Sequence, residues 1–229
     1  MNSIIITIDG YSSCGKSTLA KALAKELHYI FVDSGAMYRA ITLYFLKNGI
    51  SFTDKEMIAD ALHYIVLSFQ RNKNTGDNEI YLNSENVSAA VREMVISENV
   101  SEVAAIKEVR EFAVAQQQKI GLHKGLVMDG RDIGTTVFPD AELKIFMTAD
   151  TETRVQRRFQ ELVVKQPDIA VDEVRTNLEK RDYIDSHREI SPLRKAEDAV
   201  VLDNTNLTME QQLEIALGWA REKQVAANY

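Results

Sequence analysis

The chain has 229 residues, of which 45% are hydrophobic and 27% charged, and its formal net charge is −7. This size fits one α/β domain or one domain with an insertion, and the composition excludes a disordered, collagen-like or coiled-coil protein. The acidic balance argues against non-specific binding to nucleic acid, and the longest early apolar run is far shorter than a membrane span. With no leader ahead of that run and Cys14 as the single cysteine, we expect a cytoplasmic protein. We further expect it to bind neither nucleic acid nor membrane and to be a monomer.

Apolar, β-branched runs alternate with amphipathic helices along most of the chain. Residues 4–8 predict a strand that is buried on both faces, and residues 17–27 predict a helix with leucines four positions apart on one side. Further strands are predicted at 125–129, 143–147 and 199–203. Strands that alternate with helices imply a parallel sheet with right-handed crossovers, so we predict an α/β fold with a central parallel sheet flanked by helices.

The alternation is interrupted in the middle of the chain. Apolar runs at 65–69 and 79–82 flank a polar segment that contains a glycine, which predicts a small antiparallel hairpin. Ahead of it, Thr53 and Glu56 fit a capping box that opens a helix. We therefore predict a small lobe inserted into the α/β core. The predicted boundaries are a core of about 1–50 and 121–229 and an inserted lobe of about 51–120.

Arginines gather towards the C-terminus. Residues 151–190 predict two helices interrupted near Pro167, and seven of the thirteen arginines lie between 150 and 195. This concentration suggests a site for a polyanion, and we predict a helical lid at about 151–175; salt-bridged helices would give the same count. Thr208 and Gln211 then fit a capping box that opens the last helix.

The segment GYSSCGKS at residues 10–17 matches the pattern G-x-x-x-x-G-K-[ST], directly after the first predicted strand and directly before the first predicted helix. Glycines let the backbone turn its N–H groups towards phosphate oxygens, and the helix N-terminus adds partial positive charge. Lys16 would reach the β- and γ-phosphates, and the hydroxyl of Ser17 would bind Mg²⁺. A glycine turn with a surface lysine is the alternative. The residues expected to bind ATP here are Gly10, Tyr11, Ser12, Ser13, Cys14, Gly15, Lys16, Ser17 and Thr18.

A second motif, DSGAMYR, occupies residues 33–39. A phosphate loop followed within about twenty residues by S-G-x-M-x-R resembles the nucleoside monophosphate kinases. Together with DGRDIGTTVFPD at 129–140, SEVAA at 101–105, VRE at 109–111 and R-D-x-x-D-x-x-R at 181–188, the chain closely resembles the cytidylate kinase family. The resemblance spans nearly the whole chain and is loosest in the predicted hairpin and the C-terminal tail. It implies transfer of the γ-phosphoryl group of ATP to CMP or dCMP.

Two positions in the loop depart from that family. Ser17 stands where bacterial members often carry glycine, and Tyr11 stands where proline is usual. Serine is the choice of the general motif, so the first departure strengthens magnesium binding in principle, whereas the second would loosen the loop slightly.

The chemistry that the resemblance implies needs cations rather than a general base. A nucleoside monophosphate offers a phosphate oxygen that is largely ionised at neutral pH, so catalysis reduces to holding two anionic groups in line and neutralising the moving phosphoryl group. Among Arg154, Arg157 and Arg158 in the predicted lid, we favour Arg157 as the one that closes over ATP. The catalytic candidates are Lys16, Arg131, Arg157 and Arg188, and the metal candidates are Ser17 and Asp129, although Asp129 would also suit a helix cap or a partner of Arg131.

Recognition of cytosine calls for one carboxylate and one guanidinium, because the base presents an amino donor beside two acceptors. Asp132 could accept from the amino group, as carboxylates do in nucleic acids, and Arg110 could donate to the acceptors, although Arg110 alone would suit a solvated helix face. Arg181, Asp185 and Arg188 share one helix face. This face could bind ribose and phosphate, or it could be an internal salt-bridge ladder. The CMP-binding residues that the resemblance implies are Ser34, Arg39, Ser101, Arg110, Arg131, Asp132, Arg181, Asp185 and Arg188.

Two other functions stay open at this point. The same fold would suit a kinase for another small acceptor such as UMP, because a phosphate loop alone does not define the acceptor. A nucleotide-dependent switch that hydrolyses slowly is the second alternative. Guanine-specific switches usually add N-K-x-D, and the Asn-Lys pair of this chain, at 72–73, lacks the acid.

Overall fold

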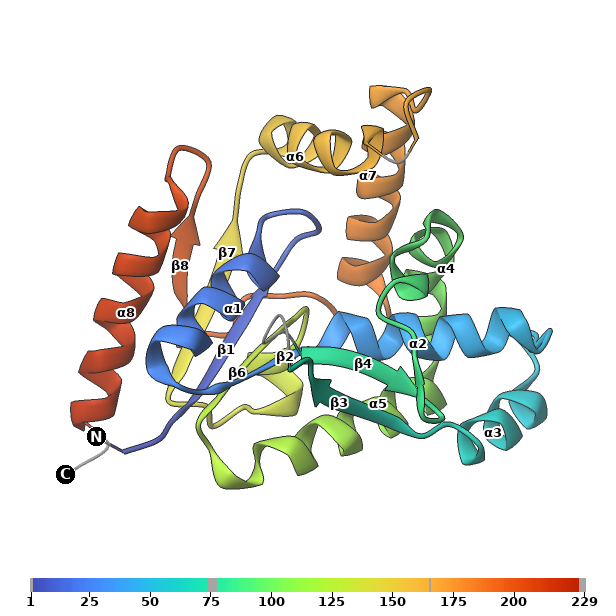
Figure 1. The fold of residues 1–229 in the computed structure, drawn as a ribbon, viewed down its shortest axis with the longest axis horizontal. Helices are drawn as coiled ribbons and strands as arrows, with labels where there is room; N and C mark the ends of the chain where they lie inside the picture. The colour runs from blue at the N-terminus through green and yellow to red at the C-terminus, as the bar shows by residue number, and fades with distance from the viewer. Residues whose placement is uncertain (1, 74–77, 165, 227–229) are drawn as a thin grey trace. The chain divides into compact units, whose positions relative to one another are not determined.

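The computed structural model describes residues 2–73, 78–164 and 166–226 (Figure 1). The chain divides into two compact units, Met1–Phe31 with Gly121–Tyr229 and Val32–Ile120. The second unit therefore includes residues 32–50, which the sequence analysis placed in the core. None of the helices among the described residues combines the length and the apolar character that a membrane span requires.

A five-stranded sheet has the strand order β2-β6-β1-β7-β8, and four of its strands, β6, β1, β7 and β8, lie wholly in the first unit. β1 pairs in parallel with β6 on one side and with β7 on the other, and it is buried along most of its length. This confirms the predicted α/β fold with a central parallel sheet. The strands are β1 (Ile5–Gly10), β2 (Ile30–Asp33), β6 (Leu126–Gly130), β7 (Leu143–Thr148) and β8 (Val200–Asp203).

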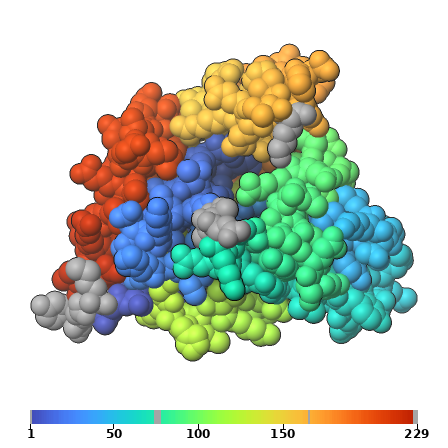
Figure 2. Space-filling view, in the orientation of Figure 1, coloured from blue at the N-terminus to red at the C-terminus, as the bar shows by residue number. Residues whose placement is uncertain are grey.

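Helices of the first unit pack against this sheet or follow its strands. The leucines of α1 and the alanines of α8 pack in one apolar core with β1 and β7, and α8 lies beside α1 at the surface in Figure 2. Thr208 and Gln211 form the predicted capping box: each backbone N–H donates to the other side chain, at 2.9 and 3.3 Å. The predicted break near Pro167 separates α6 from α7. The helices are α1 (Lys16–Leu27), α6 (Thr151–Val163), α7 (Val171–His187) and α8 (Met209–Ala226), with short turns at Gly121–His123 and Ile133–Val137.

The second unit combines helices with a small antiparallel sheet. β3 (Leu67–Arg71) pairs with β4 (Asn78–Leu82), which confirms the predicted hairpin, although residues 74–77 of its turn lie outside the described residues. A third short strand, β5 (Glu85–Asn86), was not predicted. The helices are α2 (Ser34–Lys47), α3 (Lys55–His63), α4 (Met94–Ala105) and α5 (Lys107–Ile120), with a short turn at Ala90–Arg92.

The start of α3 corrects one prediction. Its N-cap is Asp54 rather than Thr53, because the carboxylate of Asp54 accepts from the N–H groups of Glu56 and Met57, both at 3.0 Å. Aspartate is as good an N-cap as serine or threonine, so sequence spacing alone does not separate the two neighbours.

Candidate functional site

The phosphate loop connects β1 to α1, and its two glycines are required for different reasons. A Cβ on Gly10 would lie 2.0 Å from the carbonyl oxygen of Met147 in β7, so no side chain fits there. Gly15 has room for a Cβ, but its φ of 89° lies in the left-handed region that favours glycine. The neighbouring strand therefore requires the first glycine, and the backbone conformation at the start of α1 requires the second.

Lys16 and Ser17 open α1 and point in different directions. The buried Nζ of Lys16 donates to the carbonyl oxygen of Tyr11 at 2.6 Å, within the loop itself. Burial, together with the charge of Arg131, lowers the pKa of Lys16. The hydroxyl of Ser17 donates to Oδ2 of Asp129 at 2.6 Å. The structure thus brings together the two residues that were predicted to bind metal, because β1 and β6 are adjacent parallel strands that end at the same edge of the sheet.

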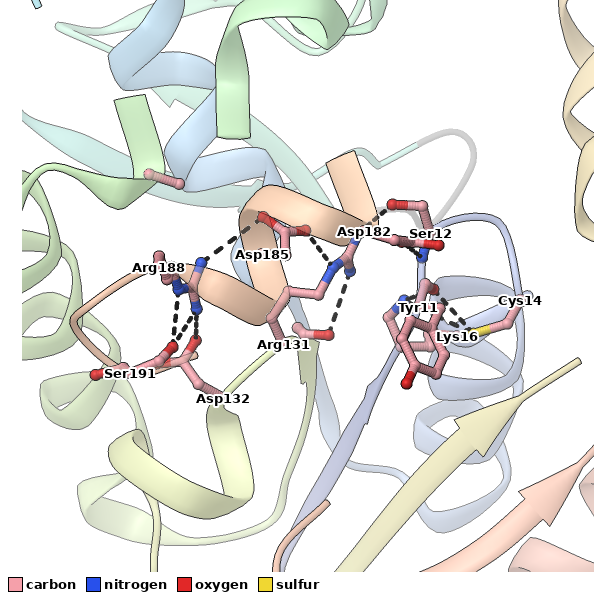
Figure 3. Close-up of polar contacts among 12 residues, drawn as sticks. Tyr11, Ser12, Cys14, Lys16, Arg131, Asp132, Asp182, Asp185, Arg188 and Ser191 are labelled. Carbon is pink, nitrogen blue, oxygen red and sulfur yellow. Dashed lines mark hydrogen bonds and ion pairs between the residues drawn. The ribbon is translucent and has the colours of Figure 1, made fainter. Parts of the chain in front are cut away.

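A largely buried network of arginines and aspartates lies beside the loop (Figure 3). Arg131 donates through Nε to Asp185 of α7 at 2.9 Å and through NH2 to the hydroxyl of Ser12 at 2.9 Å. Arg188 donates to Asp132 at 3.1 Å, and its guanidinium lies 3.8 Å from Asp185. Asp185 therefore contacts one arginine from its own end of α7 and one from the loop after β6. Because Arg131 is not on α7, its contact with Asp185 is not part of a salt-bridge ladder along one helix.

Asp182 was not among the predicted site residues, and Arg154 was ranked below Arg157. Oδ1 of Asp182 accepts from the N–H of Ser12 at 3.0 Å, and Oδ2 pairs with Arg154. The guanidinium of Arg154 also lies 5.3 Å from the centre of the Tyr11 ring, in cation–π range. Of the three arginines of α6, it is therefore Arg154 that lies on the phosphate loop.

The other two arginines of α6 have different partners. Arg157 donates to the side-chain and main-chain oxygens of Asn204, both at 3.1 Å. The amide nitrogen of Asn204 in turn donates to the carbonyl oxygen of Cys14 at 2.8 Å, which connects Arg157 indirectly to the loop. Arg158 pairs with Glu161 within the helix. The favoured candidate, Arg157, thus lies one residue away from direct contact with the loop.

The second unit holds four further candidates, whereas Arg181 lies on α7 of the first unit. Arg110 on α5 is 1% exposed, which excludes a solvated helix face; its guanidinium lies 5.4 Å from the centre of the Tyr38 ring and donates to the carbonyl oxygen of Ala104 at 3.1 Å. Arg39 pairs with Asp33 at 2.7 Å. Ser34 and Ser101 are buried. Guanidinium groups are rarely buried so fully, and the burial of Arg110 is consistent with a role other than that of a solvated surface residue.

We expect Asp185 to stabilise the protein above the ordinary pKa of a carboxyl group and to lose this effect in acid. Burial alone would raise the pKa of Asp185, but the charges of Arg131, Arg188 and Arg181 outweigh burial and hold the pKa below its usual value. A depressed pKa in the folded state gives stability that is complete above the unfolded pKa of about 3.9 and is lost as the pH falls through the folded value. The free energies of unfolding in urea of the native protein and of Asp185→Asn should therefore differ by a constant amount at pH 5 to 7 and begin to converge below about pH 4.

Glu173→Gln, which removes an exposed carboxylate from the same helix, is the matched control for this comparison. A difference between native protein and Asp185→Asn that stays constant down to pH 2.5 would contradict the expected role of the aspartate.

Residues 6–222 match the family model described as cytidylate kinase. The chain is 56% identical to the cytidylate kinase of Bacteroides thetaiotaomicron, over 93% of this chain and 95% of that protein. It is 50% identical to the cytidylate kinase of Cytophaga hutchinsonii, over 100% of this chain and 98% of that protein. Among solved structures, an uncharacterized protein from Eubacterium ventriosum is similar with a TM-score of 0.50 at 12% identity, over 96% of this chain and 99% of that one. This last likeness concerns the fold alone.

Proposed function

Because this chain belongs to the cytidylate kinase family, we propose that its site moves the γ-phosphoryl group of ATP to CMP or dCMP and releases ADP with CDP or dCDP. The observation that carries the proposal is the bridge made by Arg131, which connects Ser12 of the phosphate loop to Asp185 of α7. The phosphate loop would hold the donor, and α7 would hold the acceptor. The bridge therefore supports a cation between the two reacting phosphates.

The reaction needs little covalent chemistry from the protein. An oxygen of the acceptor phosphate, largely ionised at neutral pH, forms a bond to the γ-phosphorus while the bond from that phosphorus to the bridging oxygen of ADP breaks. Lys16 would neutralise charge on the β- and γ-phosphates, and Arg131 and Arg188 would face the moving group and the acceptor phosphate. Lys16 and Arg188 are buried, Arg131 is half-buried, and all three are already held by hydrogen bonds, so they need little rearrangement as charge develops.

Ser17 and Asp129 fit a magnesium ion that arrives with ATP. Among the described residues no group of three or more His, Cys, Asp and Glu side chains suits a metal. Magnesium in nucleotide sites is commonly held by one or two protein groups plus phosphate oxygens, which is what a hydroxyl 2.6 Å from a carboxylate provides. When bound, the ion would supply positive charge to the β- and γ-phosphates.

We propose roles in acceptor recognition for residues of each unit taken by itself. In the first unit, Asp132 would accept from the cytosine amino group, and Asp185, Arg181 and Arg188 would bind ribose and phosphate. In the second unit the corresponding residues are Ser34, Arg39, Ser101 and Arg110. The predicted acceptor lobe at about 51–120 and the predicted lid at about 151–175 stay predictions, as do the monomeric state and the cytoplasmic location.

A panel of nucleoside monophosphates with ATP and Mg²⁺ tests the proposal. We expect ADP release to require an acceptor and CMP and dCMP to be preferred. Arg110→Met and Asp132→Ala should each raise KM for CMP by about 10- to 100-fold, the discrimination expected of one good contact with a base edge, and leave KM for ATP nearly unchanged. Arg92→Met, which removes an exposed arginine of the second unit, is the control. ADP release without an acceptor would favour a switch, and unchanged CMP kinetics in both variants would contradict the proposed base contacts.

A further inference from the structure

Asp9 lies one residue before the phosphate loop, and its carboxylate is bound to another segment. Oδ1 accepts from the backbone N–H of Ile133 at 2.8 Å, and Oδ2 accepts from the N–H of Gly134 at 2.7 Å. These two residues begin the short helical turn Ile133–Val137 that directly follows Asp132. Both oxygens of one side chain on β1 thus hold the backbone next to the residue assigned to the base.

The turn lies so close to β1 that no side chain fits between them. A Cβ on Gly134 would lie 2.8 Å from the hydroxyl oxygen of Thr7 and 3.3 Å from Oδ2 of Asp9. Residues two apart on a strand share a face, so Thr7 and Asp9 support the turn from the same side. The backbone position after Asp132 is therefore set by contact with β1 as well as by two hydrogen bonds.

A carboxylate at this position is costly to the fold. Asp9 is 5% exposed, and burial raises its pKa to about 6, an effect that the two N–H donors only partly offset. The charge of Asp132 acts in the same direction as burial, and the charge of Lys16 opposes it. At pH 8 the group is ionised and can accept both hydrogen bonds. Residues that break a local rule at a cost in stability are concentrated at functional sites.

We propose that Asp9 is a positioning residue for acceptor selection, which acts by holding the backbone of Ile133 and Gly134 and thereby setting the direction of the Asp132 carboxylate. The inference rests on the proposed role of Asp132 in reading the base. Asp132 also accepts from Arg188 at 3.1 Å, so a displaced turn would disturb that contact as well. In Asp9→Asn the amide oxygen can still accept one of the two hydrogen bonds. The amide NH₂ group is a donor, so it faces the other backbone N–H without being able to accept from it.

A double-mutant cycle with Asp9→Asn and Asp132→Ala tests this. Asp9→Asn should raise KM for CMP about tenfold, as expected for the loss of one hydrogen bond to a charged group, reduce the preference for CMP over UMP, and leave KM for ATP within about twofold. In the Asp132→Ala background the same change should raise KM for CMP less than about twofold, because a residue that acts through Asp132 has nothing left to position.

Glu142→Gln is the matched control for a purely structural effect. The carboxylate of Glu142 accepts from the N–H of Ile5 at 2.9 Å, at the other end of β1, so the change from carboxylate to amide is the same. It should lower the melting temperature and leave the acceptor kinetics unchanged. If Asp9→Asn yields little folded protein, Gly134→Ala displaces the same turn with Asp9 intact and should also reduce the preference for CMP.

The outcomes separate the two proposals. If Asp132→Ala leaves KM for CMP unchanged, the proposed function fails at that residue, and the inference fails with it. If Asp132→Ala raises KM while Asp9→Asn and Gly134→Ala leave the preference for CMP intact, the inference alone is overturned. If the increases in KM for CMP caused by Asp9→Asn and by Asp132→Ala multiply fully in the double variant, the inference is overturned as well.

Discussion

Replacing Arg131 with methionine is expected to lower kcat by about a thousandfold or more, the range seen when an arginine that neutralises a transferring phosphoryl group is lost. Its guanidinium contacts both Asp185 and Ser12, at 2.9 Å each, so in the proposed reaction it would lie between donor and acceptor. Steady-state kinetics with ATP and CMP measure the effect, with thermal unfolding alongside. We expect some loss of stability, because Asp185 loses one of its cationic partners while it stays buried.

Arg131→Lys refines this test. Lysine keeps the positive charge but lacks the planar fork that binds two partners, so it should recover only a small part of kcat. Arg221→Met, which removes an exposed arginine of α8, should behave as the native protein. A kcat of Arg131→Met within tenfold of the native value, in folded protein, would exclude Arg131 from the mechanism.

Lys16→Met is expected to lower kcat by about a hundredfold to a thousandfold, because electrostatic stabilisation of the transition state is commonly the largest catalytic contribution. The protein should stay folded. Burial and the charge of Arg131 already disfavour the ammonium group, so a neutral side chain of similar length relieves that cost. ADP release in the presence of CMP and a thermal melt provide the two measurements.

Lys25→Met serves as the control for Lys16, since Lys25 is an exposed lysine in the last turn of the same helix. Preserved turnover in Lys16→Met would contradict the role assigned to the phosphate loop.

The elements of the fold were predictable where local chemistry determines them. Residues 4–8 are apolar and β-branched, as a strand buried on both faces requires, and the reciprocal bonds of Thr208 and Gln211 involve residues three apart. The N-cap of α3 was wrong by one residue because Thr53 and Asp54 both favour that position. The short strand β5 was missed, since two residues carry no periodicity.

The site was predictable where a motif or a strand end carries it. Ser17 was predicted to bind metal from the phosphate-loop motif and Asp129 from its place at the end of a predicted strand, and the structure places their side-chain oxygens 2.6 Å apart. Asp182 contacts Ser12 across 170 residues, and Asp9 contacts Ile133 across 124, so no local pattern indicates either pair. The burial of Arg110 was equally hidden, because its neighbours Lys107 and Glu108 suggest a solvated helix face.

The first glycine of the phosphate loop, Gly10, has a structural role that does not depend on nucleotide binding. Because the carbonyl oxygen of Met147 occupies the space of a Cβ on Gly10, a larger residue there would separate two paired strands at the centre of the sheet. Selection for a chain that merely folds is enough to retain this glycine. It would persist in a descendant that had abandoned catalysis, and its presence in such a chain would record the architecture of the ancestor rather than any surviving activity.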